Sequence, residues 1–260
     1  MEETNMTKRT TTIVPSALLL LIVGLGLASA GEERNYRGEA YNLQTGEFLY
    51  SENHQELYEN GQHVASVVSY RDAMGREIVR SESVLRSSRT TPDFRSEDQR
   101  TGYTEGAQAV ANGTRLFWRE DKARSERGRT LRIPAPGVID AGFDYFIREN
   151  WDELAAGKAL IFHFAVPHQL DYYHFRVGKS GEVTLDGIRC IQFRLAPAAL
   201  LARLFVDPIY VAYDVDHRRL MDYRGVTNIP DDKGKNHRAW ITFTYPWTKP
   251  VNSTSSATAR

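Results

Sequence analysis

Three histidines lie close together in the second half of the chain, and they are the first residues whose chemistry needs an interpretation. His163, His168 and His174 fall within twelve residues. If Pro167–Leu170 forms a hairpin turn, His163 and His174 become direct cross-strand partners on one face of a sheet. Such a pair can share a metal ion, but His168 would then lie in the turn, and the spacing matches no standard zinc pattern. We therefore interpret the pair as ordinary strand histidines and expect no metal site.

Other reactive side chains form no recognisable catalytic pattern. The chain has no Gly-x-Ser-x-Gly nucleophile elbow, and Gly178-Lys-Ser-Gly181 is interpreted as a turn because it lacks the spacing of a phosphate loop. The single cysteine, Cys190, alternates with charged or polar neighbours and is expected to be a small buried hydrophobe. We assign no catalytic residue and no cofactor. A hydrolase or metal-binding enzyme that uses His163 or His174 as a base remains an alternative.

The most informative feature is a concentration of bulky aromatic residues in the second half. They are more numerous than one helix on one layer of sheet would be expected to cover. One interpretation places them all in the core, and the other lets part of them line a cavity for an apolar ligand. On the second interpretation we predict the ligand-binding residues Phe143, Phe146, Trp151, Phe162, Phe164, Tyr173, Phe193 and Trp240.

Strand and turn signals dominate the remainder of the chain. Asn60-Gly61 separates two alternating segments and predicts a β-hairpin, because both residues tolerate a positive φ. An apolar stripe at helical spacing predicts one main helix over Asp140–Ala156, with Asp140 as N-cap and Gly157 as its stop. Arg86–Gln108 is rich in Ser, Thr, Arg and acidic residues, and is expected to be a polar loop or a poorly ordered segment.

These elements predict a mainly β fold without βαβ alternation or internal repeats. We expect a large, curved antiparallel sheet, an incomplete β-barrel, with the helix packed on its concave face. It would form a single domain over residues 31–250, followed by a disordered tail over 251–260.

The first thirty residues have the three parts of a secretory signal peptide. Lys8 and Arg9 precede an apolar run, and Ala28-Ser29-Ala30 provides a cleavage site before Gly31. Met6 would be a better start than Met1, since two acidic residues would no longer precede the basic pair. We expect a periplasmic or secreted protein with no stable membrane insertion after cleavage. Equal numbers of basic and acidic residues, 33 each, argue against a nucleic-acid binder.

The order of motifs in the second half is also informative. Asp140-Ala-Gly-Phe-Asp-Tyr-Phe-Ile-Arg148 is followed by Gly157-Lys-Ala-Leu-Ile-Phe162, Asp186-Gly187, Tyr223-Arg-Gly225 and a final strand. This order resembles an uncharacterised family of exported proteobacterial proteins. That family in turn resembles the half-barrel periplasmic lipoprotein carriers LolA and LolB. The resemblance covers roughly 140–245 and implies a helix-closed half-barrel with an apolar cavity for acyl chains. The chain departs from the carriers in its greater length and its polar stretch at Arg86–Gln108.

From these observations we expect a soluble periplasmic carrier that holds a lipid, an acyl chain or a similar apolar small molecule. One alternative is an envelope scaffold that binds another protein through a sheet edge. The other alternative is the hydrolase based on the histidine pair.

Overall fold

The structure is a computed structural model that describes residues 31–199 and 206–246. The expected signal peptide (1–30) and tail (251–260) lie outside the described residues. The first half of the described chain consists of strands β1 (Glu32–Asn42), β2 (Phe48–Glu59), β3 (Gln62–Arg71), β4 (Glu77–Val84), β5 (Asp93–Asp98), β6 (Thr104–Val110), β7 (Gly113–Arg119) and β8 (Arg127–Leu131).

The second half begins with a short strand and the helices and then returns to strands. Its elements are β9 (Gly137–Ile139), α1 (Gly142–Glu149), α2 (Trp151–Ala155), β10 (Leu160–Val166), the 3₁₀ helix η1 (Pro167–Gln169), β11 (Asp171–Leu185), β12 (Ile188–Pro197), β13 (Ile209–Asp214), β14 (Leu220–Pro230) and β15 (Asn236–Thr244). The mainly β prediction is confirmed.

All described strands belong to one sheet with the order β8-β7-β6-β5-β4-β3-β2-β1-β15-β14-β13-β12-β11-β10-β9. Chain neighbours pair in antiparallel hairpins, and β1 also pairs with β15 near the middle of the sheet. The purely antiparallel prediction is wrong at one edge, because β9 runs parallel to β10. That parallel crossover is made through α1 and α2, which is the kind of connection that parallel neighbours require.

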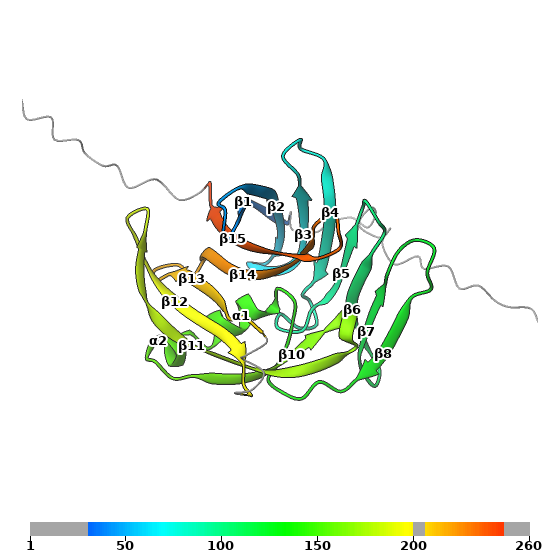
Figure 1. Cartoon of the computed structure of the whole chain (residues 1–260). Helices are drawn as coiled ribbons and strands as arrows, with labels where there is room; N and C mark the ends of the chain where they lie inside the picture. Colours follow the sequence, from blue (N-terminus) through cyan, green and yellow to red (C-terminus); the bar gives the residue numbers. More distant parts are fainter. Residues whose placement is uncertain (1–30, 200–205, 247–260) are drawn as a thin grey trace, which may run out of the picture.

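Local sequence explains both the hairpins and the curvature. Asn60 and Gly61 have φ values of 51° and 75°, as a tight turn between β2 and β3 requires. Register shifts interrupt the pairings β1–β2, β2–β3, β3–β4, β11–β12, β13–β14 and β14–β15. Such bulges bend a strand and increase its twist. The sheet accordingly curls around α1, as Figure 1 shows, and is consistent with a half-barrel.

The two ends of the sheet approach each other without backbone pairing between β8 and β9. Phe94 and Leu116 from one end pack with Ile139 and Ala165 from the other in a buried apolar cluster. One ion pair and one histidine–carboxylate contact cross the same seam: Arg129 lies 3.8 Å from Asp171, and His168 lies 3.6 Å from Glu105. Side chains therefore join the sheet ends, although the sheet is not closed into a barrel by hydrogen bonds.

The predicted single helix is two short helices, and this is a correction. Asn150 separates them with φ −105° and ψ 22°, and its side-chain amide donates to the Phe146 carbonyl oxygen at 2.8 Å. Asp140 is not the N-cap, because Ala141 occupies that position. Gly157 follows the second helix with a φ of 92°, as predicted. Within the described ranges, neither helix is long and apolar enough to span a bilayer.

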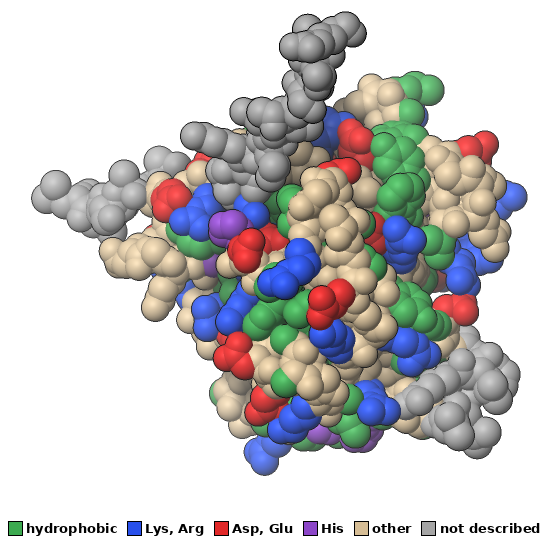
Figure 2. All heavy atoms as spheres, turned by 90° about the vertical axis from the view of Figure 1, so that its left-hand side faces the viewer, with side chains coloured by type: hydrophobic (Ala, Val, Ile, Leu, Met, Phe, Trp, Pro, Cys, Tyr) green, Lys and Arg blue, Asp and Glu red, His purple; other side chains and the backbone are tan. Residues whose placement is uncertain are grey.

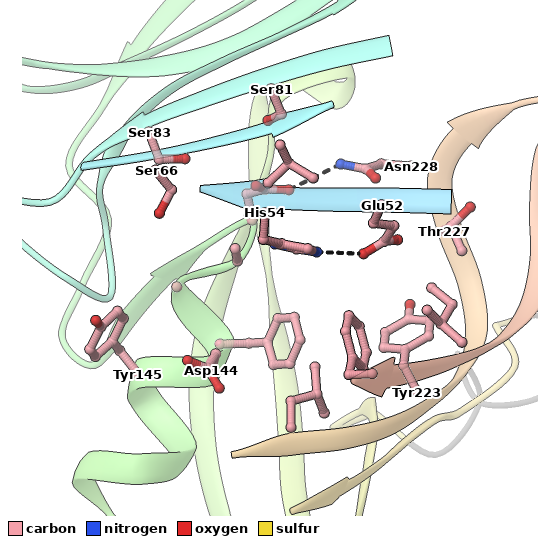
Figure 3. A pocket seen from close by; sticks show the side chains of 18 of the residues that line it. Glu52, His54, Ser66, Ser81, Ser83, Asp144, Tyr145, Tyr223, Thr227 and Asn228 are labelled. Atoms are coloured by element: carbon pink, nitrogen blue, oxygen red, sulfur yellow. Dashed lines mark hydrogen bonds and ion pairs between the residues drawn. The ribbon is translucent and has the colours of Figure 1, made fainter. Parts of the chain in front are cut away.

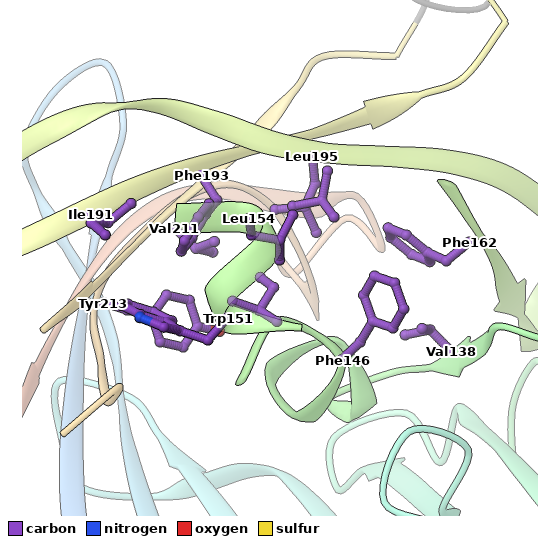
Figure 4. Close-up of a cluster of buried hydrophobic side chains, with 12 residues drawn as sticks. Val138, Phe146, Trp151, Leu154, Phe162, Ile191, Phe193, Leu195, Val211 and Tyr213 are labelled. Atoms are coloured by element: carbon purple, nitrogen blue, oxygen red, sulfur yellow. The ribbon is translucent and has the colours of Figure 1, made fainter. Parts of the chain in front are cut away.

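The main core lies between the helices and the concave face of β10–β13 (Figure 4). Its fully buried members include Ile147 and Leu154 from the helices and Phe162, Phe193 and Tyr213 from the strands. The Trp151 ring packs edge-on against Phe193, with ring centroids 5.6 Å apart. The prediction that helix packs on the concave face is therefore confirmed.

Two segments differ from their predicted form. Arg86–Gln108 contains β5 and most of β6 rather than a polar loop, and Phe94 and Ala107 are its buried apolar residues. Gly178–Gly181 does not turn the chain. It lies inside the long strand β11, where the register against β12 shifts between Lys179 and Gly181. The polar composition of both segments concealed their strand structure.

Candidate functional site

The curved sheet surrounds an open cavity of about 1930 Å³. Ordinary small-molecule sites have roughly 300–1,000 Å³, so this cavity has room for a large ligand. Its wall is built from β1–β6, helix α1 and β10–β15. Figure 3 shows part of this wall, with Ser66, Ser81 and Ser83 on one side and Asp144 and Tyr145 projecting from α1.

One side of the cavity is apolar and rests on the main core. It consists of Phe143 on α1 together with Phe162, Phe164, Phe175, Leu195 and Ile209 on β10–β13. Phe162 is 6.3 Å from Phe164 and 6.2 Å from Phe175, measured between ring centroids. Alternation along β10 aims Phe162 and Phe164 inward, whereas Ile161 on the opposite face is 53% exposed.

The facing side is polar and is dominated by β2. The inward residues of this strand are Tyr50, Glu52, His54, Glu56 and Tyr58, at a spacing of two. The sequence does not reveal this wall, because β2 has no apolar face. The alternation was visible in the sequence, but it does not tell which polar set faces inward.

Glu52 is held at the centre of this wall. Its side chain is only 8% exposed, and its Oε2 lies 2.9 Å from His54 Nε2. The His54 ring stacks on Tyr36, with ring centroids 4.2 Å apart, and Tyr36 stacks in turn on Tyr245 at 4.8 Å. A carboxylate thus sits at the edge of an aromatic stack inside the cavity.

Asp140 supplies a second interior carboxylate. It follows β9 in a left-handed conformation, with φ 46°, and its Oδ1 accepts a hydrogen bond from Asn228 Nδ2 at 3.1 Å. Burial raises the pKa of Asp140 to about 6, and the nearby Glu105 and Glu52 charges act in the same direction. Asp140 therefore marks a place where negative charge is concentrated and poorly compensated.

The cavity face of α1 carries a compensated charge pair instead. Arg148 donates to Asp144 one turn earlier, and its guanidinium lies 4.5 Å from the Tyr145 ring centroid. The Tyr145 hydroxyl lies 2.6 Å from His63 Nδ1 on β3. Burial lowers the pKa of His63, which favours the neutral ring that can accept from this hydroxyl. The hydrogen bond fixes α1 to the polar side of the cavity.

The overall charge of the wall differs from that of the chain. Among the described lining residues, eleven are acidic and three are arginines, although the whole chain carries 33 of each sign. Each of the three arginines has an acidic partner: Arg34 with Glu32, Arg148 with Asp144, and Arg219 with Asp214. By contrast, Figure 2 shows basic and acidic side chains interspersed over one outer face. The interior is therefore the acidic part of a neutral protein.

The eight aromatic residues predicted to bind ligand fall into three groups. Phe143 and Phe164 line the cavity, and Phe162 contributes to the same wall although it is only 1% exposed and also belongs to the main core. Phe146, Trp151 and Phe193 belong to the buried core beneath it, with exposed fractions of 5%, 6% and 0%. Tyr173 and Trp240 are 45% and 37% exposed and lie outside the cavity lining. The Trp240 indole N–H donates to Asp222, which also lies outside the lining.

The histidine pair and the cysteine also lie outside the cavity lining. His163 pairs with His174 in the predicted register, and their ring centroids are 4.6 Å apart. No group of three His, Cys, Asp or Glu side chains suited to a metal occurs within residues 31–199 and 206–246. Cys190 is fully buried, and burial raises the pKa of its thiol to about 11, which disfavours the nucleophilic thiolate.

Comparison with known proteins gave only distant structural likenesses. No family model matches the chain, and no curated protein matches it in sequence. A DUF1329 family protein from Desulfovibrio piger is 9% identical, with a TM-score of 0.27 over 84% of this chain and 86% of that one. An outer membrane lipoprotein-sorting protein domain from Vibrio parahaemolyticus is 7% identical, with a TM-score of 0.26 over 86% of both chains. Likenesses at this level establish neither a family nor a function.

Proposed function

We propose that this protein is an exported binding protein that holds an amphiphilic small molecule, such as a lipid, inside its curved sheet. The observation that carries the proposal is the 1930 Å³ cavity with one apolar and one polar side. A fully apolar space would suit a hydrocarbon, and a fully polar one a sugar or peptide. A cavity with both kinds of wall suits a molecule that has an apolar body and a polar head.

The apolar side supplies the driving force for binding. Each methylene that leaves water for this wall contributes about 0.8 kcal/mol. The wall rests on a packed core, so Phe162 and Leu195 are held in place before the ligand arrives. Such preorganisation reduces the entropy lost on binding. The work of such a protein would be the transport of an amphiphile through the envelope, or its storage there.

We propose that the protein is located in the periplasm or the extracellular space. It rests on the basic, apolar and small-residue order of the first thirty residues. A carrier of this kind would keep its ligand out of water between two membranes or outside the cell.

Native mass spectrometry tests the proposal directly. The full chain would be expressed with its own N-terminus, recovered without detergent and sprayed under native conditions, and released small molecules would be identified. We expect a reproducible amphiphile adduct on a chain that begins at Gly31. A chain that retains residues 1–30 would contradict the proposed export.

A matched pair of variants on β10 locates the adduct. Phe164→Asn changes the cavity wall, whereas Ile161→Asn changes the exposed face of the same strand. We expect the adduct to disappear in the first variant and to persist in the second. Loss in both, or in neither, would contradict binding in this cavity.

The sheet-edge scaffold receives less support. Arg127 and Arg129 on the edge strand β8 are exposed, and charged edges resist pairing with another chain. The other edge strand, β9, has only three residues and is largely buried.

A further inference from the structure

The cavity wall contains carboxylates that have no lysine or arginine partner among the described residues. Most buried carboxylates have an arginine partner: Asp98 with Arg100, Asp214 with Arg219, and Asp222 with Arg224. Glu52, Glu105 and Asp140 differ. Among the residues that the structure describes, none of the three has a lysine or arginine within ion-pair distance.

Their partners are histidines, a tyrosine hydroxyl and a side-chain amide, and none of these is a permanently charged cation. Glu52 contacts His54, and Asp140 accepts from the amide of Asn228. Glu105 accepts from the Tyr103 hydroxyl at 3.0 Å and lies 3.6 Å from His168. A buried carboxylate without a full positive partner is costly, because desolvation is not repaid. A cavity that holds two buried carboxylates, Glu52 and Glu105, and the half-buried Asp140 gains from any ligand that supplies the missing charge.

Three tyrosine rings lie near Glu52. Tyr50, Tyr70 and Tyr223 all have raised pKa values, caused first by burial and further by the charge of Glu52. The Tyr50 and Tyr70 rings meet edge-to-face, with ring centroids 5.8 Å apart. Ring faces attract ammonium groups, and carboxylates add charge to that attraction.

Tyr50, beside Glu52 on the cavity wall, is a second group whose polar atom is incompletely satisfied. It precedes Glu52 on the inward face of β2, and it is 0% exposed. Its buried hydroxyl makes no hydrogen bond of normal geometry among the described residues, and the Thr227 side chain is the polar group beside it. A buried hydroxyl without a well-placed partner is rare. The wall around Glu52 therefore holds polar groups that the protein itself satisfies incompletely.

We propose that the cavity selects an amphiphilic cation, with its ammonium head among Glu52, Glu105 and Asp140 and its apolar body on the wall of Phe143, Phe162 and Phe164. This inference rests on the proposed function and names its ligand class. Arg148, the one arginine on the cavity face of α1, does not favour an anion instead, because Asp144 already neutralises it.

The test compares three probes with the same chain and different heads: n-decylamine, n-decanol and n-decanoate. Their affinities for the full exported chain would be measured by calorimetry at pH 8, below their micelle concentrations. We expect the amine to bind at least tenfold more tightly than the alcohol, and the carboxylate to bind most weakly. If none of the probes binds, the proposed function fails. If the alcohol or the carboxylate binds as tightly as the amine, only the cation inference is overturned.

Charge-removing variants assign the effect to the cavity. Glu52→Gln and Asp140→Asn keep the shape of the side chain, and each should weaken amine binding at least threefold while leaving decanol binding unchanged. Asp152→Asn removes the same charge from a side chain that is 91% exposed and outside the cavity lining. It should leave all three affinities unchanged. An equal loss of amine affinity in this control would show a general charge effect and would overturn the assignment.

Discussion

Replacing Asp140 with asparagine should stabilise the protein, and the gain should depend on pH. In the folded state the pKa of Asp140 is raised from 3.8 to about 6. Because the folded state holds this proton more tightly, the stability that the group contributes is lost as pH rises from about 4 through 6. At pH 7.5 the ionised carboxylate therefore costs about 3 kcal/mol, and at pH 4 only about 0.5 kcal/mol, at 1.36 kcal/mol per pKa unit.

The Asp140→Asn variant removes this cost while keeping an oxygen that can accept from Asn228. A gain of about 3 kcal/mol corresponds to a rise of roughly 6–12 °C in melting temperature for a chain of this size. Thermal unfolding followed by circular dichroism at pH 7.5 and pH 4 would measure both values. Acid effects elsewhere in the protein act on both forms and cancel in the difference.

The exposed Asp152→Asn variant is the control, and it should change stability by less than about 0.5 kcal/mol at either pH. A variant that is less stable than the wild type at pH 7.5 would refute the reasoning. So would a stability gain of the same size at both pH values, since the effect would then not come from the carboxylate charge. The expected result would also mean that Asp140 is retained at the expense of stability, as binding groups often are.

Three further predictions concern the scaffold. Gly142→Ala should destabilise the protein by more than 1 kcal/mol in denaturant titrations, because the added Cβ would lie 2.1 Å from the Thr90 carbonyl oxygen at the start of α1. An unchanged denaturation midpoint would show that Gly142 and Thr90 are not packed this closely. Gly61→Ala should cost about 1–2 kcal/mol, since φ there is 75°, and a neutral result would mean that the β2–β3 turn adopts another form. Arg219→Met should lower the free energy of unfolding by about 3–5 kcal/mol, because the side chain of Asp214 is 1% exposed and loses the arginine that lies 2.7 Å away. A decrease below about 1 kcal/mol would contradict a buried ion pair.

Local signals predicted the parts of this fold that local physics determines. Asn60-Gly61 identified its hairpin because few other residues accept two successive positive φ values. Pro167–Leu170 likewise placed His163 opposite His174. In both cases a turn sets the register of the strands beside it, so the sequence near the turn is sufficient.

The errors arose where distant parts of the chain decide the local structure. Asp140 has the residue type of an N-cap, but its carboxylate accepts a hydrogen bond from Asn228 on β14 instead of capping α1. β5 and β6 alternate polar residues with few apolar ones, and their buried faces are completed by Ile139 and Ala165 from the other end of the sheet. The polar side of the cavity escaped prediction for the same reason. Glu52 is buried by its neighbours in space, and nothing in its own strand indicates it.

The pairing of β1 with β15 also has a consequence for how the chain acquires its structure. Most strands pair with a chain neighbour and can form as soon as both strands have been synthesised. Strand β1 also pairs with β15, with Arg37 opposite Thr244, and this pairing can form only after β15 has been synthesised. The order of synthesis therefore leaves the β1 edge open until nearly the whole chain has emerged. A chain shortened before Asn236 would leave β1 and β14 as exposed edges near the centre of the sheet, where self-association is the expected result. The two halves of the chain therefore join into one sheet only when β15 pairs with both β1 and β14.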